Sequence, residues 1–140
     1  MKDRSFLDTN VFLYVFDKTA PAKARKASEL IRDAITSRKG VVSYQVVQEF
    51  LNVALKRFPV PMTVPEAEQY IFKVFRVLLS APPSEVLFTE ALHLSGRYQF
   101  AWYDSLIVAA AIQAECSIIY TEDLQHGLQV RGLRIENPFH

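Results

Sequence analysis

Residues 102–120, WYDSLIVAAAIQAECSIIY, predict a buried helix that is followed directly by a buried strand. The helix is expected over residues 102–114, and every residue from Leu106 to Ile112 is apolar, so it has no face suited to water. Residues 117–120 are then expected to form a β-strand. A helix that is apolar all round must be covered on every side, so we expect it at the centre of the molecule.

The rest of the chain alternates strands and helices in the same way. Strands are expected at residues 4–7, 41–43, 85–88, 117–120 and, as an edge strand, 133–135. Helices are expected at residues 11–16, 44–57 and 102–114, from Pro21 to a stop at Gly40, from a capping box at Thr63 to Leu79, and from Thr89 to near Gly96. This order predicts an α/β fold with a mostly parallel central sheet flanked by helices, forming a single domain over residues 1–140.

Composition excludes several classes of protein. The 140 residues carry 16 basic and 15 acidic side chains, and half of the chain is apolar, which is typical of a folded domain rather than a disordered one. The longest apolar run, residues 106–112, is too short to span a membrane, and Asp8 and Asn10 interrupt the apolar N-terminal stretch. We therefore expect a cytoplasmic protein without membrane contact. The single cysteine, Cys116, excludes an internal disulfide, and the four glycines are too scattered for a phosphate-binding loop.

Acidic residues follow the predicted strands at the positions where parallel α/β sheets bind ligands. Asp8 follows the first strand, and Glu49 lies in the first turns of the helix after the second. Asp104 lies in the first turn of the buried helix, and Glu122 and Asp123 follow the strand at 117–120. Each of these residues alone suits a helix cap, a turn or a solvent-exposed rim. Their joint placement at the carboxyl ends of the strands favours one shared site.

Carboxylates that are held close together repel one another, and their pKa values rise unless a cation neutralises them. Sites made only of oxygen ligands select Mg²⁺ or Mn²⁺ rather than Zn²⁺. Two such ions can activate a water molecule and stabilise the leaving oxygen of a phosphodiester. The pattern therefore predicts metal-dependent hydrolysis of nucleic acid without a covalent intermediate.

Four segments together resemble a PIN domain, and within that family the VapC-type toxins of type II toxin–antitoxin pairs. They are Phe6-Leu-Asp8-Thr-Asn10, Gln48-Glu49-Phe50, the run from Trp102 to Ala111, and Tyr120-Thr-Glu-Asp123-Leu. The resemblance covers nearly the whole chain. It implies a three-layer, Rossmann-like PIN fold and an endoribonuclease that uses Mg²⁺ or Mn²⁺ as cofactor. It also implies an RNA substrate, a VapB-like antitoxin that blocks the site, and a homodimer.

The resemblance also assigns roles to individual residues. It implies that Asp8, Asp104 and Asp123 hold metal directly, and that Glu49 binds a second ion or orients water. The hydroxyl groups of Thr9 and Thr121 match positions that support the first and last acids. Glu122 competes with Asp123 for the fourth position, and the family pattern, with the acid two residues after the threonine, favours Asp123.

Two further features bear on function. Arg97 precedes Asp104 among interleaved aromatic residues and is a candidate for contact with an RNA phosphate; Trp102 and Phe100 are expected in the core rather than stacked on bases. The alternative function is a catalytically silent PIN-like module that binds RNA or protein. The intact set of four acids argues against that alternative, because a silent module has no need of them.

Overall fold

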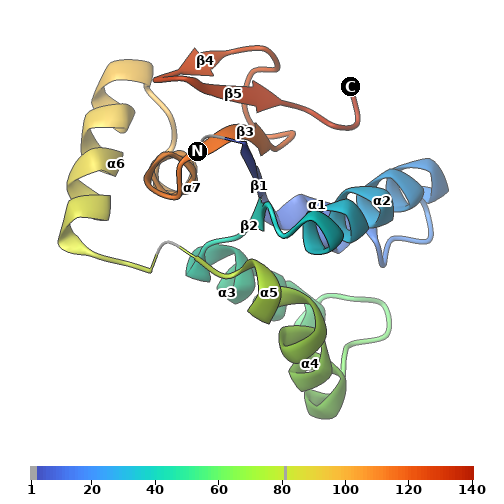
Figure 1. The fold of residues 1–140 in the computed structure, drawn as a ribbon. Helices are drawn as coiled ribbons and strands as arrows, with labels where there is room; N and C mark the ends of the chain where they lie inside the picture. The colour runs from blue at the N-terminus through green and yellow to red at the C-terminus, as the bar shows by residue number, and fades with distance from the viewer. Residues whose placement is uncertain (1–2, 81) are drawn as a thin grey trace.

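The central sheet confirms the predicted α/β class. The computed structural model describes residues 3–80 and 82–140, and within them a five-stranded sheet has the order β2-β1-β3-β5-β4 (Figure 1). β1 pairs in parallel with β2 and β3, β3 pairs in parallel with β5, and only β4 runs antiparallel to its neighbour. The strands are β1 (Arg4–Leu7), β2 (Gly40–Val41), β3 (Cys116–Tyr120), β4 (Gln129–Val130) and β5 (Leu133–Glu136).

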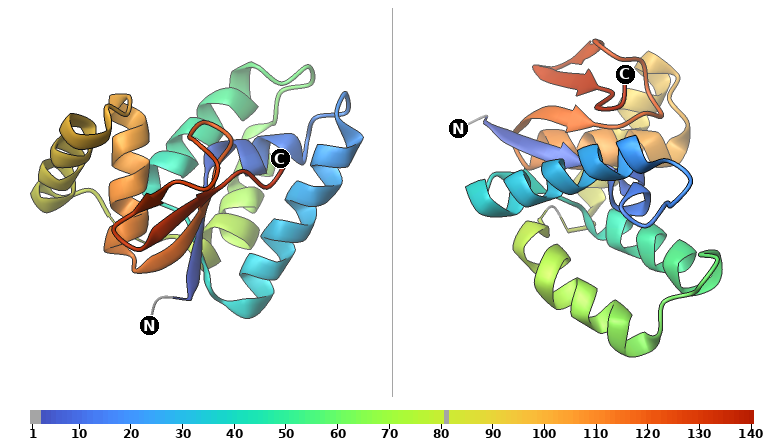
Figure 2. Two further views of the ribbon diagram at one scale, coloured as in Figure 1. Left: turned by 90° about the horizontal axis from the view of Figure 1, so that it is seen from above. Right: turned by 90° about the vertical axis from the view of Figure 1, so that its right-hand side faces the viewer.

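Helices cover both faces of this sheet. Figure 2 (left) shows α6 and α7 on one side of the strands and α2 on the other, which gives three layers. The helical elements are α1 (Thr9–Tyr14), α2 (Pro21–Ser37), α3 (Tyr44–Lys56), α4 (Val64–Tyr70), the π-helical turn η1 (Ile71–Phe75), α5 (Arg76–Leu78), α6 (Glu85–Tyr98) and α7 (Trp102–Gln113). The expected helix from Thr63 to Leu79 is present as the succession α4, η1 and α5, with the capping box at its start.

Helix α7 is the buried element that its sequence predicts. Every residue from Ser105 to Ala111 is buried, and the helix packs between α6 and β3. Because β1 and β3 are neighbours in parallel, Leu7 lies opposite Tyr120, and the residues that follow each strand emerge at the same edge of the sheet. This register is what brings Asp8 beside Thr121, although 113 residues separate them in sequence.

The strand expected at residues 85–88 is wrong, because these residues begin helix α6. The Ser84 hydroxyl accepts a hydrogen bond from the backbone N–H of Leu87 at 3.1 Å and caps the helix, so the expected cap at Thr89 is wrong as well. Four residues rich in Val, Leu and Phe are too few to show the spacing of buried positions that separates a helix from a strand. Over the full length of α6 that spacing is helical, because Leu87, Ala91 and Leu94 are buried.

Two smaller expectations also fail. Gly40 does not end the second helix: α2 stops at Ser37, Arg38 takes the left-handed conformation with φ 60°, and Gly40 lies in β2. A Cβ at Gly40 would lie 2.3 Å from the Cβ of Ala34, so glycine permits the close approach of β2 to α2. The strand at 133–135 is not at an edge, since β4 pairs with its outer side.

Within the described chain, no helix has the length and apolar character needed to cross a bilayer.

Candidate active site

Asp8 is the most buried acid of the candidate site, with 6% of its surface exposed. Its backbone N–H donates to the carbonyl oxygen of Tyr120 at 3.0 Å, which joins the ends of β1 and β3. Its carboxylate caps α1: Oδ1 accepts from the N–H of Thr9 and Oδ2 accepts from the hydroxyl of Thr121, both at 2.7 Å. Burial raises the pKa of Asp8 to about 6, against the lowering effect of these two hydrogen bonds.

Asp104 lies in the first turn of α7 and is partly buried. Burial is the main cause that raises its pKa, and the negative charges of Asp123 and Glu49 add to that effect. The same two carboxylates also raise the pKa of Asp8. Asp123 and Glu49 thus act electrostatically on both Asp8 and Asp104, and we call these four residues the acid cluster.

The two exposed members of the acid cluster are held by amide side chains. The Nδ2 group of Asn10 donates to both carboxylate oxygens of Asp123, at 3.3 and 3.4 Å. The Nε2 group of Gln45 donates to Oε1 of Glu49 at 2.7 Å. Among residues 3–80 and 82–140, no lysine or arginine pairs with a carboxylate of the acid cluster. Its negative charge is therefore not neutralised from within the described chain.

Thr121 connects the first and last acids. Its hydroxyl donates to Asp8 Oδ2 at 2.7 Å and accepts from the backbone N–H of Asp123 at 3.1 Å. Thr9 acts differently from the expectation, because only its backbone N–H contacts Asp8 and its buried hydroxyl has no hydrogen-bond partner in the described residues. Asn10 and Gln45 are site residues that the sequence analysis missed. Asn10 stands in the Asp-Thr-Asn segment that follows the first strand. Gln45 lies one helical turn before Glu49, and this spacing is the sequence signal for its contact with Glu49.

Glu122 is held by residues of α1 and α2. The Tyr14 hydroxyl donates a short hydrogen bond to its Oε1, and the ammonium group of Lys23 lies 3.4 Å from its Oε2. Lys23 also lies 3.2 Å from the Tyr14 hydroxyl oxygen. The charge of Glu122 is thus balanced locally, whereas Asp123 contributes its charge to Asp8 and Asp104.

Arg97 lies in the last turn of α6 and is exposed. Its guanidinium carbon is 5.4 Å from the centroid of the Tyr98 ring, and in the described chain it forms no ion pair with the acid cluster. Trp102 is 37% exposed, so the expectation of a core position for it is wrong. Phe100 is partly buried against the core and stacks on Tyr98 with ring centroids 5.3 Å apart.

The chemistry of the acid cluster suits a hard divalent cation. All its donors are carboxylate oxygens, it carries no paired cation in the described chain, and Asp123 and Glu49 raise the pKa values of Asp8 and Asp104. As the described side chains are placed, no group of three or more His, Cys, Asp or Glu residues is close enough together to hold a metal ion. The fit therefore rests on donor type and charge.

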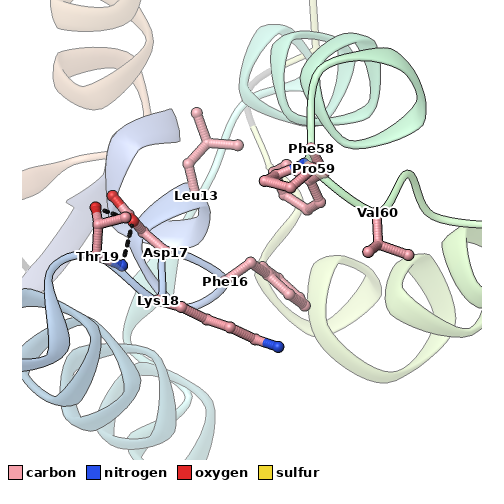
Figure 3. A pocket seen from close by; sticks show the side chains of 8 residues that line it. All are labelled: Leu13, Phe16, Asp17, Lys18, Thr19, Phe58, Pro59 and Val60. Carbon is pink, nitrogen blue, oxygen red and sulfur yellow. Dashed lines mark hydrogen bonds between the residues drawn. The ribbon is translucent and has the colours of Figure 1, made fainter.

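A separate cavity of about 460 Å³ lies between the segment after α1 and the segment after α3 (Figure 3). Its walls are mainly apolar, with Phe16, Phe58 and Val60 among them. The carboxylate of Asp17 at its rim accepts hydrogen bonds from the backbone N–H and the hydroxyl of Thr19, at 2.9 and 2.6 Å. No member of the acid cluster lines this cavity, so it is distinct from the candidate site.

Comparison with known proteins identifies the family. The model of the PIN domain matches residues 5–127. The structure is similar to a chain of a toxin-antitoxin complex from Klebsiella pneumoniae, with a TM-score of 0.68 and 17% sequence identity over 96% of this chain and 97% of that one. No match was found among proteins with curated descriptions. The resemblance inferred from the four sequence segments is thus confirmed, and the chain belongs to the PIN domain family.

Proposed function

We propose that this protein is an endoribonuclease that depends on Mg²⁺ or Mn²⁺, hydrolyses RNA phosphodiester bonds, and acts as the toxin of a type II toxin–antitoxin pair. PIN domains are generally nucleases and generally use divalent metals. The similar Klebsiella protein is described as part of a toxin-antitoxin complex, which supports an antitoxin partner here. The observation that carries the proposal is the acid cluster: Asp123 and Glu49 raise the pKa of both Asp8 and Asp104, and no cation pairs with them in the described chain.

Each acid has a role that follows from its surroundings. Asp8 and Asp104, the two more buried members, would hold the metal together with Asp123. A bound ion would supply positive charge and Lewis acidity at the phosphodiester. Glu49 is exposed, and Gln45 fixes its Oε1, so its second oxygen is available to bind a further ion or to orient the attacking water. The hydrogen bond from Thr121 lowers the pKa of Asp8 against the effect of burial, and the same hydroxyl accepts from the backbone N–H of Asp123.

The proposal extends to assembly and location. A VapB-like antitoxin would block the acid cluster, the toxin would form a homodimer, and the pair would act in the cytoplasm. Arg97 remains a candidate contact for an RNA phosphate, since its exposed guanidinium has no ion-pair partner in the described chain.

A cleavage assay on end-labelled RNA tests the proposal. Purified protein is incubated with Mg²⁺ and, separately, with EDTA, alongside the Asp104→Asn variant and the control Glu68→Gln, which removes an exposed acid on α4. We expect cleavage by the wild type and the control with Mg²⁺, and none with EDTA or by Asp104→Asn. A folded Asp104→Asn variant that cleaves at the wild-type rate would refute the assignment. RNA binding without any cleavage would favour the silent module.

A further inference from the structure

A small hollow lies directly beside the acid cluster. It has a volume of about 170 Å³ and is lined by residues of α3, α6 and α7. Figure 2 (left) shows α7 between α6 and α3, the three helices that meet around it. Three of its lining residues are aromatic, namely Tyr44, Phe88 and Tyr103. We call it the aromatic hollow.

The aromatic side chains of this hollow are exposed to solvent. Tyr103 is 68% exposed, Phe88 46% and Tyr44 45%, and none of them stacks on another aromatic ring in the described residues. By contrast, Phe50 is fully buried and stacks on Tyr70 with ring centroids 4.8 Å apart. Clustered apolar exposure of this kind marks a binding surface.

Gln45 joins the aromatic hollow to the acid cluster. It lines the hollow, and its Nε2 group donates both to Glu49 at 2.7 Å and to the backbone carbonyl of Tyr103 at 3.2 Å. Tyr103 immediately precedes Asp104 in the first turn of α7. Gln45 therefore links the aromatic hollow to the acid cluster through two hydrogen bonds.

Polar groups at the hollow suit a nucleotide. Ser43 lines it, is 4% exposed, and has a hydroxyl without a hydrogen-bond partner in the described chain. Gln48 adds an exposed amide, a group that pairs with the edges of bases. The N-terminus of α3 has no side-chain cap and no acid in its first turn, so its helix dipole favours a phosphate.

We propose that the aromatic hollow binds a base of single-stranded RNA that neighbours the cleaved phosphodiester, with Tyr103 as the stacking platform. This inference rests on the proposed function, because it places the RNA by reference to the acid cluster. Bases of a duplex are stacked and paired, so only an unpaired base can lie flat on an aromatic side chain. The hollow thereby selects unpaired RNA as substrate.

Fluorescence polarisation tests this inference. It measures the binding of six-nucleotide oligouridylate and oligoadenylate RNA with Ca²⁺ in place of Mg²⁺. The variants are Tyr103→Leu, Tyr103→Phe and Phe72→Leu, the last a control that removes a half-exposed ring on η1. Tyr103→Leu should bind on the order of tenfold more weakly, while Tyr103→Phe and Phe72→Leu stay within about twofold of the wild type. Trp102, the single tryptophan, gives a second readout: its fluorescence should change on binding in the wild type and much less in Tyr103→Leu.

Two outcomes would overturn the inference: binding by Tyr103→Leu that equals the wild type, or equal affinity of the wild type for a short RNA duplex. Tyr103 is largely exposed, so its loss should not prevent folding, and Tyr44→Leu provides an independent check of the same surface. If cleavage depends on Asp104 but binding does not depend on Tyr103, the RNA-binding role of the aromatic hollow is refuted and the proposed function is not. Absence of cleavage by the wild type would instead refute the proposed function.

Discussion

Replacing Asp8 by Asn should make the metal-free protein more stable at neutral pH while it abolishes activity. Burial and neighbouring acids move the pKa of Asp8 from its usual 3.8 to about 6, which corresponds to on the order of 3 kcal/mol at 1.36 kcal/mol per pKa unit. The folded state binds this proton more tightly than the unfolded state, so stability falls as the pH rises from about 4 to about 6. Asn resembles the protonated acid in shape and carries no charge to desolvate.

The assay is urea denaturation of the wild type and Asp8→Asn in EDTA, at pH 4 and at pH 7.5. At pH 7.5 the variant should be more stable by up to about 3 kcal/mol, or roughly 6–12 °C in melting temperature at about 2–4 °C for each kcal/mol. At pH 4 the difference should nearly vanish, and titrations of groups shared by both proteins cancel in the comparison. A variant that is less stable than the wild type at pH 7.5, or a difference that does not depend on pH, would refute the reasoning.

Three other predictions concern the acid cluster and the sheet. Saturating Mn²⁺ should raise the melting temperature of the wild type and raise that of Asp104→Asn much less; equal shifts would argue against a metal at this residue. Glu122→Gln should keep the cleavage rate within about threefold, whereas Asp123→Asn should lower it by at least about a hundredfold, because loss of a residue that only supports a ligand already costs about 10–100-fold; the reverse order would make Glu122 the fourth acid. Gly40→Ala should lower the free energy of unfolding by about 1–3 kcal/mol through overpacking, and an unchanged denaturation midpoint would contradict that close contact.

The fold was predictable where the hydrophobic pattern agrees with the residues that begin and end helices and strands. The apolar run in α7 and the strand β3 after it are long enough to be assigned as helix and strand from their sequence. They place the sheet next to a buried helix. The residues at 85–88 are the counterexample. Val, Leu and Phe favour a strand locally, but the period that identifies α6 emerges only over fourteen residues. Helix packing against α7 then overrides the local preference.

The placement of the candidate acids after the strands was predictable from the sequence, and their contacts were not. The order of strands and acids indicates one edge of a parallel sheet, so Asp8 and Asp104 could be chosen from sequence. Whether Glu122 or Asp123 faces that edge depends on backbone angles in the turn after β3, and on Tyr14 and Lys23, which lie 108 and 99 residues from Glu122. No local pattern encodes contacts across such separations.

Diffraction at the manganese absorption edge, from crystals grown with Mn²⁺, measures the position of the metal itself. The account predicts an anomalous peak in contact with carboxylate oxygens of Asp8 and Asp104, with Asp123 at the same ion. It also predicts that the peak is lost in crystals of Asp8→Asn. Peaks only at other surfaces, or a peak that persists unchanged in the variant, would contradict the claim that these separated acids form one metal-binding cluster.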